Sequence, residues 1–130
     1  MARILLDTTV LIDALRGRPA ARRLVSLRRS GVEPWACAIS VEEIWRGLLP
    51  TEEKRARRLC DGLRIAPLGV VEAIRAGRWR REFADRGVTL HQADCLIAAA
   101  AVRVGAALAT ANVDDYPMAA VELMPWPVGA

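Results

Sequence analysis

The segment RILLDTTVLIDALR (residues 3–16) is the most informative part of the sequence for the fold, because it has the pattern of a strand followed directly by a helix. Residues 3–7 form a short aliphatic run that ends in Asp7 and is typical of a buried strand. Residues 9–16 then repeat apolar side chains at helical spacing, and Gly17 ends the repeat. The side chains on that apolar face are Val10, Leu11, Ala14 and Leu15. A strand that leads directly into a helix predicts the first unit of an α/β protein.

The rest of the chain continues this alternation. Further strands are expected at residues 34–39, 64–68, 106–110 and 121–124. Further helices are expected at residues 20–30, 40–49, 51–62, 70–86 and 90–104. Because the strands are apolar along their length, both of their faces should be buried. The pattern predicts a three-layer α/β/α sandwich with a central parallel sheet, built as a single domain over residues 1–130.

Composition limits the class of protein. A hydrophobic fraction of 53% with 26% charged residues indicates a compact globular chain. Three distant cysteines and one histidine exclude a structural zinc site and make buried free thiols the simplest interpretation. The longest uncharged stretch is only ten residues, Val104 to Val113, and the N-terminus has no signal-peptide core. We therefore expect a cytoplasmic protein that does not span a membrane.

Charge is unevenly distributed along the sequence. Residues 1–86 carry 18 basic and 11 acidic side chains, whereas residues 87–130 carry one arginine and four acids. This asymmetry favours an anionic partner on the basic surface and a cation near the acidic part. A compositional origin stays open, because 18 of the 19 basic residues are arginine.

Two acidic residues stand out at predicted element boundaries. Asp7 closes the first strand at the carboxyl edge of the sheet, where α/β proteins bind ligands, although it could equally cap the following helix. Asp94 follows Thr89 and Gln92, which have the spacing of a capping box and would put it in the second turn of a largely apolar helix. A buried carboxylate there needs a cation or an arginine partner.

Other acids are ambiguous when taken alone. Glu43 lies three residues after Ser40, so a second capping box would explain it, and the adjacent Glu42 should point away. The segment TANVDDY (residues 110–116) follows a strand and could be a turn, a ligand-binding loop or both. His91 is more typical of a surface or capping residue than of a catalytic base. The four tryptophans are expected mainly in the core or at interfaces.

Taken together, acids from several elements should gather at one sheet edge. Clustered carboxylates repel one another, so a cation is the natural reason for the cluster, and all-oxygen ligands select Mg²⁺ or Mn²⁺. The sequence has no phosphate-binding glycine loop, dinucleotide fingerprint, zinc-peptidase motif or serine-hydrolase elbow. The sequence therefore predicts a Mg²⁺ or Mn²⁺ site at this edge of the sheet.

Four segments in order resemble the PIN-domain ribonucleases, and specifically the VapC toxins of bacterial VapBC toxin–antitoxin pairs. They are LLDTTVLIDAL, ISVEEIWRG, DCLIAAAA and LATANVDDY. The resemblance covers the whole chain. It implies a metal-dependent endoribonuclease that cleaves cellular RNA (tRNA or rRNA) to inhibit translation and growth, forms a homodimer and is inhibited by a VapB-type antitoxin.

Matched by motif, the family's first three acids fall on Asp7, Glu43 and Asp94. The family's fourth position, often aspartate, is here Asn112, so the resemblance leaves the missing charge to Asp115, with Asp114 as a lesser candidate. The resemblance thus implies a Mg²⁺ or Mn²⁺ site with catalytic and metal-binding roles for these acids.

Two other functions remain open from the sequence. One is a non-catalytic α/β interaction module whose acids are helix caps and ion pairs. The other is an aspartyl phosphatase with Asp7 as nucleophile, although that chemistry usually places an acid where Thr9 stands.

Overall fold

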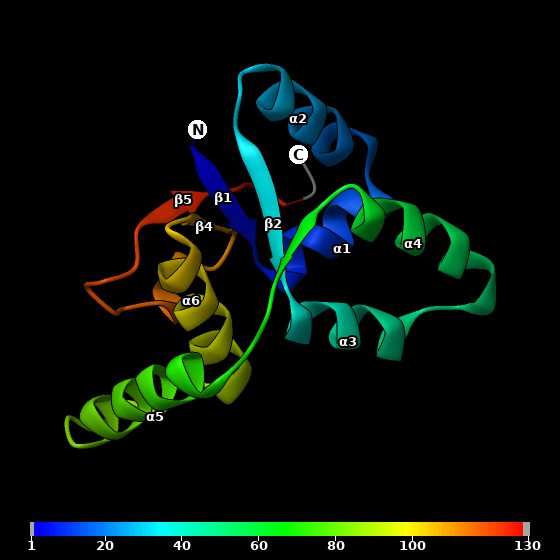
Figure 1. The fold of residues 1–130 in the computed structure, drawn as a ribbon. Helices are drawn as coiled ribbons and strands as arrows, with labels where there is room; N and C mark the ends of the chain where they lie inside the picture. Colours follow the sequence, from blue (N-terminus) through cyan, green and yellow to red (C-terminus); the bar gives the residue numbers. More distant parts are fainter. Residues whose placement is uncertain (1, 129–130) are drawn as a thin grey trace.

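A parallel β-sheet forms the centre of the computed structural model, which describes residues 2–128 (Figure 1). Its strands follow the order β3-β2-β1-β4-β5, and every neighbouring pair is parallel. The strands are β1 (Arg3–Leu6), β2 (Glu33–Cys37), β3 (Arg64–Ala66), β4 (Ala107–Thr110) and β5 (Leu123–Pro125). The predicted parallel sheet is confirmed, and β3 is shorter than expected because the chain reaches Pro67, which has no backbone N–H to add to the ladder.

Helices cover both faces of this sheet. They are α1 (Thr8–Arg16), α2 (Arg18–Arg29), α3 (Ala38–Gly47), α4 (Glu53–Asp61), α5 (Val70–Ala84) and α6 (Gln92–Val104). Single 3₁₀ turns lie at η1 (Pro50–Glu52) and η2 (Val113–Asp115). In Figure 1, α5 and α6 lie on one side of the sheet, and α1, α2 and α4 lie on the other. The three-layer α/β/α prediction is confirmed.

Side-chain alternation along β1 explains the two layers. Ile4 and Leu6 belong to the core cluster beneath α1 and α2, whereas Leu5 belongs to the cluster beneath α5 and α6. All three are at most 4% exposed. A strand buried on both faces requires apolar residues at every position, and this is why RILL does not alternate with polar residues.

The strand order reverses beside β1, and this reversal positions the site. From β1 the chain builds outward through β2 to β3, then returns to place β4 on the other side of β1. The segments that follow β1 and β4, helix α1 and the loop with η2, therefore diverge at the carboxyl ends of these strands, where parallel sheets leave a crevice. Asp7 follows β1, and its backbone N–H donates to the carbonyl of Ala109 in β4 at 3.0 Å.

The capping box expected at Ser40 is wrong. Helix α3 begins at Ala38, directly after β2, and its N-cap position is Cys37. Ser40 is therefore inside the first turn and is fully buried. Its hydroxyl lies 2.8 Å from the hydroxyl of Thr8 instead of capping the helix. Glu43 is consequently not a capping residue.

The capping box expected at Thr89 is also wrong. Helix α6 begins at Gln92 with His91 at the N-cap, so Asp94 lies in the first turn and not the second. His91 is exposed and makes no side-chain cap, in agreement with the prediction of a surface or capping position. Gly105 ends the helix with a φ of 68°, a conformation that glycine adopts without a steric penalty.

The remaining expectations are largely met in the part of the chain that the structure describes. Cys37 and Cys95 are buried free thiols, and Cys60 is half-buried. Trp79 and Trp126 lie in the core, and the other two tryptophans pack against it. No helix in residues 2–128 is both long and apolar enough to cross a bilayer.

Candidate active site

A pocket of about 260 Å³ opens at the carboxyl ends of β1 and β4. It gathers side chains from the end of β1, from α1, α3 and α6, and from the loop after β4. The lining residues that matter for its chemistry are Asp7, Glu43, Asp94, Asn112 and Asp115, with Arg46 and Tyr116. All five residues assigned to the site by sequence lie in this one pocket. Glu42 and Asp114 are exposed and do not line it.

Asp7 is held by donors on both carboxylate oxygens. Its Oδ1 accepts hydrogen bonds from the Thr9 hydroxyl at 2.7 Å and from the Val10 backbone N–H at 3.0 Å. Its Oδ2 accepts from the Thr110 hydroxyl at 2.5 Å and from the Tyr116 hydroxyl at 3.5 Å. Asp7 is only 3% exposed, and these donors offset the cost of burying its charge. The capping role weighed from sequence is therefore real, and it coexists with a place in the pocket.

Glu43 is oriented by a chain of hydroxyl groups. The Thr8 hydroxyl donates to Glu43 Oε1 at 2.8 Å, and the same hydroxyl lies 2.8 Å from Ser40 Oγ. Ser40 is buried and fixed on α3, one turn before Glu43, so it anchors the chain from the protein interior. Because the contact joins α1 to α3, it sets how far Glu43 reaches toward the end of β1.

Asp94 reaches the pocket from the first turn of α6. Burial raises the pKa of its carboxyl group, and the nearby charge of Asp115 raises it further, with a smaller contribution from Asp7. His91 and the Tyr116 hydroxyl oppose these effects. Tyr116 donates to Asp94 Oδ1 at 3.4 Å. The ionised form of Asp94 is therefore unfavourable at this position, and a bound cation would stabilise it.

The loop after β4 contributes an amide and one of two adjacent acids. The backbone N–H of Asn112 donates to the Thr110 hydroxyl at 2.9 Å, which fixes the start of the loop. The 3₁₀ turn η2 then puts Asp115 in the pocket lining and Asp114 outside it. Of the two acids considered as a replacement for the family's fourth aspartate, Asp115 therefore has the suitable position.

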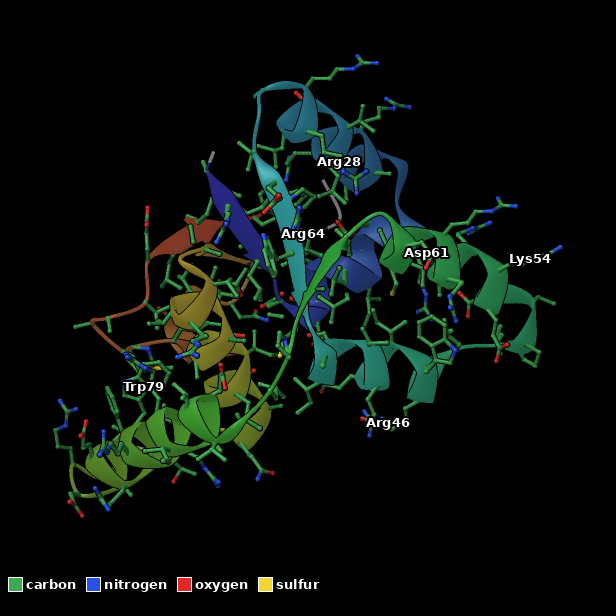
Figure 2. All side chains as sticks on the ribbon, in the orientation of Figure 1. Arg28, Arg46, Lys54, Asp61, Arg64 and Trp79 are labelled. Atoms are coloured by element: carbon green, nitrogen blue, oxygen red, sulfur yellow. The ribbon has the colours of Figure 1, made fainter. Side chains whose placement is uncertain are left out.

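The pocket carboxylates form no salt bridge with a basic side chain in the part of the chain that the structure describes. The ion pairs there use other acids, namely Glu33, Glu52, Asp61 and Glu72. The arginine partner that the sequence left open for Asp94 is not found among these residues. Arg46 lines the pocket but is exposed and pairs with none of its acids. Figure 2 shows Arg46 projecting from α3 on the side away from α4.

The donor set fits a hard divalent cation, although it is not drawn together as a finished coordination shell. Within residues 2–128, no three acidic, histidine or cysteine side chains converge closely enough to form a ready-made metal site. Mutual repulsion and the hydrogen bonds of Asp7 and Glu43 explain this spacing. Four carboxylates and an amide are nevertheless the oxygen ligands that Mg²⁺ and Mn²⁺ prefer.

Sequence reasoning missed the hydroxyl groups that organise these acids. Thr8, Ser40, Thr110 and Tyr116 each contact a pocket acid directly or through one further hydroxyl. In the sequence, Thr8 and Tyr116 stand out only because each of them directly follows an acid. Ser40 was assigned to a cap because its spacing from Glu43 matches that motif. Because β2 ends at Cys37, α3 starts before Ser40, so Ser40 lies inside the helix and cannot cap it.

Comparisons with known proteins identify the family of the chain. The model of the PIN-domain family matches residues 4–121. Ribonuclease VapC10 from Mycobacterium tuberculosis is 39% identical over 117 residues, which cover 88% of this chain and 86% of that protein. The resemblance carried by the four sequence segments is thus confirmed.

Solved structures share the fold. VapBC2 from Rickettsia felis, bound to a DNA fragment from its promoter, contains a chain with a TM-score of 0.86 at 20% identity, covering 96% of this chain and 99% of that one. A toxin–antitoxin complex from Klebsiella pneumoniae contains a chain with a TM-score of 0.76 at 25% identity, covering 96% and 99%. The layered architecture is therefore that of these proteins.

Proposed function

This chain belongs to the PIN-domain family and, within it, to the VapC ribonucleases, and we propose that it is a metal-dependent endoribonuclease whose active site is the acidic pocket. One observation carries the proposal. Carboxylates from separate segments line one pocket at the reversal point of the sheet, and none of them forms a salt bridge with a described basic residue. A cluster of this kind is costly unless a cation joins it.

The residues that would hold Mg²⁺ or Mn²⁺ are Asp7, Glu43, Asp94, Asn112 and Asp115. When bound, such an ion lowers the pKa of a water ligand and offsets negative charge on the phosphodiester and its leaving oxygen. Asn112 is neutral, so Asp115 would supply the charge that the fourth family position lacks. Support comes from its place in the pocket lining and its effect on the pKa of Asp94.

Hydroxyl and backbone N–H groups of the protein would orient the acids of the pocket. The hydroxyl of Thr9 and the backbone N–H of Val10 would keep Asp7 fixed, while Thr8 would keep Glu43 directed into the pocket. Ligands that are already fixed lose less conformational freedom when a cation binds. No side-chain base is required in this scheme, which agrees with the exposed position of His91.

Basic residues of the pocket and of two helices would bind the RNA backbone. Arg46 is the basic side chain of the pocket lining, and its guanidinium, which forms no salt bridge among the described residues, suits a phosphate beside the cut. Arginines in residues 16–29 and 75–86 would contact flanking phosphates, with no preference for base sequence.

We further propose that the chain is the toxin of a type II toxin–antitoxin pair, as the toxin–antitoxin complexes of similar fold suggest. It would cleave tRNA or rRNA in the cytoplasm to inhibit translation and growth, bind a VapB-type antitoxin, and form a homodimer. Residues 1–130 would act as a single nuclease domain.

Incubation with total RNA tests the central claim. We expect discrete cleavage products with Mg²⁺ or Mn²⁺, none with EDTA, and none from Asp94→Asn in either case. Asp61→Asn is the matched control, because Asp61 is an exposed acid on α4, outside the pocket, whose partner is Arg57. Cleavage by Asp94→Asn at the wild-type rate would contradict the assignment of the active site to this pocket. Cleavage in EDTA would contradict the metal dependence of the reaction.

A further inference from the structure

One hydroxyl group lies between two acids of the pocket. The phenol of Tyr116 is 3.5 Å from Asp7 Oδ2 and 3.4 Å from Asp94 Oδ1, so it connects the end of β1 to the first turn of α6. Tyr116 is 3% exposed. Because an ionised carboxylate only accepts hydrogen bonds, the phenol is the donor, and it shares its one proton between the two contacts.

The two acids depend on this hydroxyl unequally. Asp7 has three other donors, at 2.5, 2.7 and 3.0 Å, and keeps its orientation without the phenol. Among the residues described, Tyr116 is the side chain that donates a hydrogen bond to Asp94. Asp94 is also close enough to Asp115 for the two carboxylates to repel each other.

We propose that the Tyr116 hydroxyl is a positioning group that turns the Asp94 carboxylate toward Asp7. The inference rests on the proposed function in one respect, since it treats these two acids as ligands of one cation. A phenylalanine at this place would fill the same core volume, so the oxygen atom and not the aromatic ring carries the effect. Tyr116 itself need not touch the cation or the RNA.

The effect should be visible in metal binding. Without the hydroxyl, Asp94 regains side-chain rotamers that must be lost again when a cation binds. The conformational entropy lost when one such side chain is fixed lowers the affinity for the cation by roughly threefold to tenfold. We therefore expect Tyr116→Phe to bind Mn²⁺ about threefold to tenfold more weakly than the wild type in titration calorimetry with Mn²⁺ alone. Unchanged or tighter binding would overturn the proposal, because the phenol would then be filling space or competing with the ion.

A second measurement needs no metal and separates this inference from the proposed function. Thermal unfolding of Tyr116→Phe, Asp94→Ala and the double variant forms a cycle that measures the direct interaction. We expect the double variant to melt about 2 °C higher than the sum of the two single shifts predicts. Additive shifts would overturn the contact between these side chains.

The matched control removes a different hydroxyl from the same pocket. Thr9 donates to Asp7 and not to Asp94, so the shift of Thr9→Val should add to that of Asp94→Ala. A Tyr116 cycle that is non-additive beside a Thr9 cycle that is additive supports the positioning role, even if the wild type fails to bind Mn²⁺. That failure would contradict the proposed metal site alone. Equal non-additivity in both cycles would overturn the specific role of Tyr116.

Discussion

The Thr8 hydroxyl lies 2.8 Å from Glu43 Oε1 and 2.8 Å from Ser40 Oγ, so the first turn of α1 is joined to α3 at a carboxylate. This relationship decides what Glu43 does. A capping glutamate would reach back to a backbone N–H of its own helix, whereas Glu43 reaches across to another helix. Its side chain is therefore available to the pocket.

Glu43→Gln should reduce metal-dependent RNA cleavage by more than roughly 10-fold while changing the free energy of unfolding by about 1 kcal/mol or less. The amide retains an acceptor for Thr8 but loses the charge that a cation needs. Cleavage assays and urea unfolding measure the two quantities separately.

The neighbouring acid provides the control for this prediction. Glu42 is exposed and does not line the pocket, so Glu42→Gln should leave both cleavage and unfolding close to wild type. Equal loss of cleavage in the two variants would indicate a general field effect of α3 and not a specific role of Glu43.

Asp94→Asn should raise the melting temperature of the metal-free protein at neutral pH. Burial and the charge of Asp115 raise the pKa of Asp94 above its unfolded value of 3.8, so ionised Asp94 opposes folding. That penalty is complete above the raised pKa, shrinks as the pH falls through it, and vanishes below the unfolded pKa.

The difference in melting temperature between variant and wild type should therefore shrink as the pH falls toward 4 and disappear below the unfolded pKa of Asp94, 3.8. Calorimetry across this pH range measures it. A variant that is less stable than the wild type at every pH would mean that favourable interactions of Asp94, such as the hydrogen bond from Tyr116, outweigh the cost of its burial and repulsion.

The sequence predicted the layers and the gathering of acids because both follow from local patterns. Apolar strands such as residues 3–6 must be buried on two faces, and acids that follow parallel strands meet at one edge. Asp7 and the loop containing Asp115 could be located in this way without any knowledge of packing.

Helix starts and cross-element contacts could not be predicted in the same way. Ser40 and Thr89 match capping motifs, but α3 begins two residues before Ser40 because β2 ends at Cys37, and α6 begins three residues after Thr89. The partner of Ser40 is Thr8, 32 residues away, and no local pattern encodes that contact. The same holds for Tyr116, whose role depends on the path of the loop after β4.

Asp115→Asn should weaken Mn²⁺ binding by about 10-fold, and Asp114→Asn should leave it nearly unchanged. Of these two acids, the turn η2 directs only Asp115 into the pocket, and only Asp115 is among the charges that raise the pKa of Asp94. Titration calorimetry with Mn²⁺ compares the pair directly. Equal, mild effects from both would mean that the loop supplies a diffuse negative field and no ligand.

Arg46→Ala should raise KM for RNA by about 10-fold with little change in Mn²⁺ affinity. A hydrogen bond to a charged group is worth roughly 1.5–3 kcal/mol, and Arg46 lines the pocket without an acidic partner among residues 2–128. Arg46→Lys should recover only part of the loss, because an ammonium cannot form the paired contacts of a guanidinium. Tighter Mn²⁺ binding with unchanged KM would mean that the positive charge of Arg46 only repels the cation and that Arg46 does not contact RNA.

RNA binding should fall steeply with salt if the basic helices contact phosphates. The slope is roughly 0.7 log units per log unit of salt for each phosphate neutralised on a single strand. On α2 the better pair to replace is Arg22 and Arg29, because Arg23 stacks on Trp126 at 4.9 Å and its loss would also disturb packing. On α5 the pair is Arg80 and Arg81, both exposed.

Each double alanine variant should lower the slope and weaken binding to every RNA tested, without moving the cleavage position, because phosphate contacts position a strand and base contacts select it. Binding is measured on the Asp94→Asn background so that RNA stays intact. Replacement of Lys54 and Arg57 on α4 removes the same charge from outside the proposed path, and Figure 2 shows Lys54 projecting away from that helix. If all three double variants behave alike, only net charge matters. If neither α2 nor α5 changes the slope, these arginines face the antitoxin or the second protomer, and RNA follows another path.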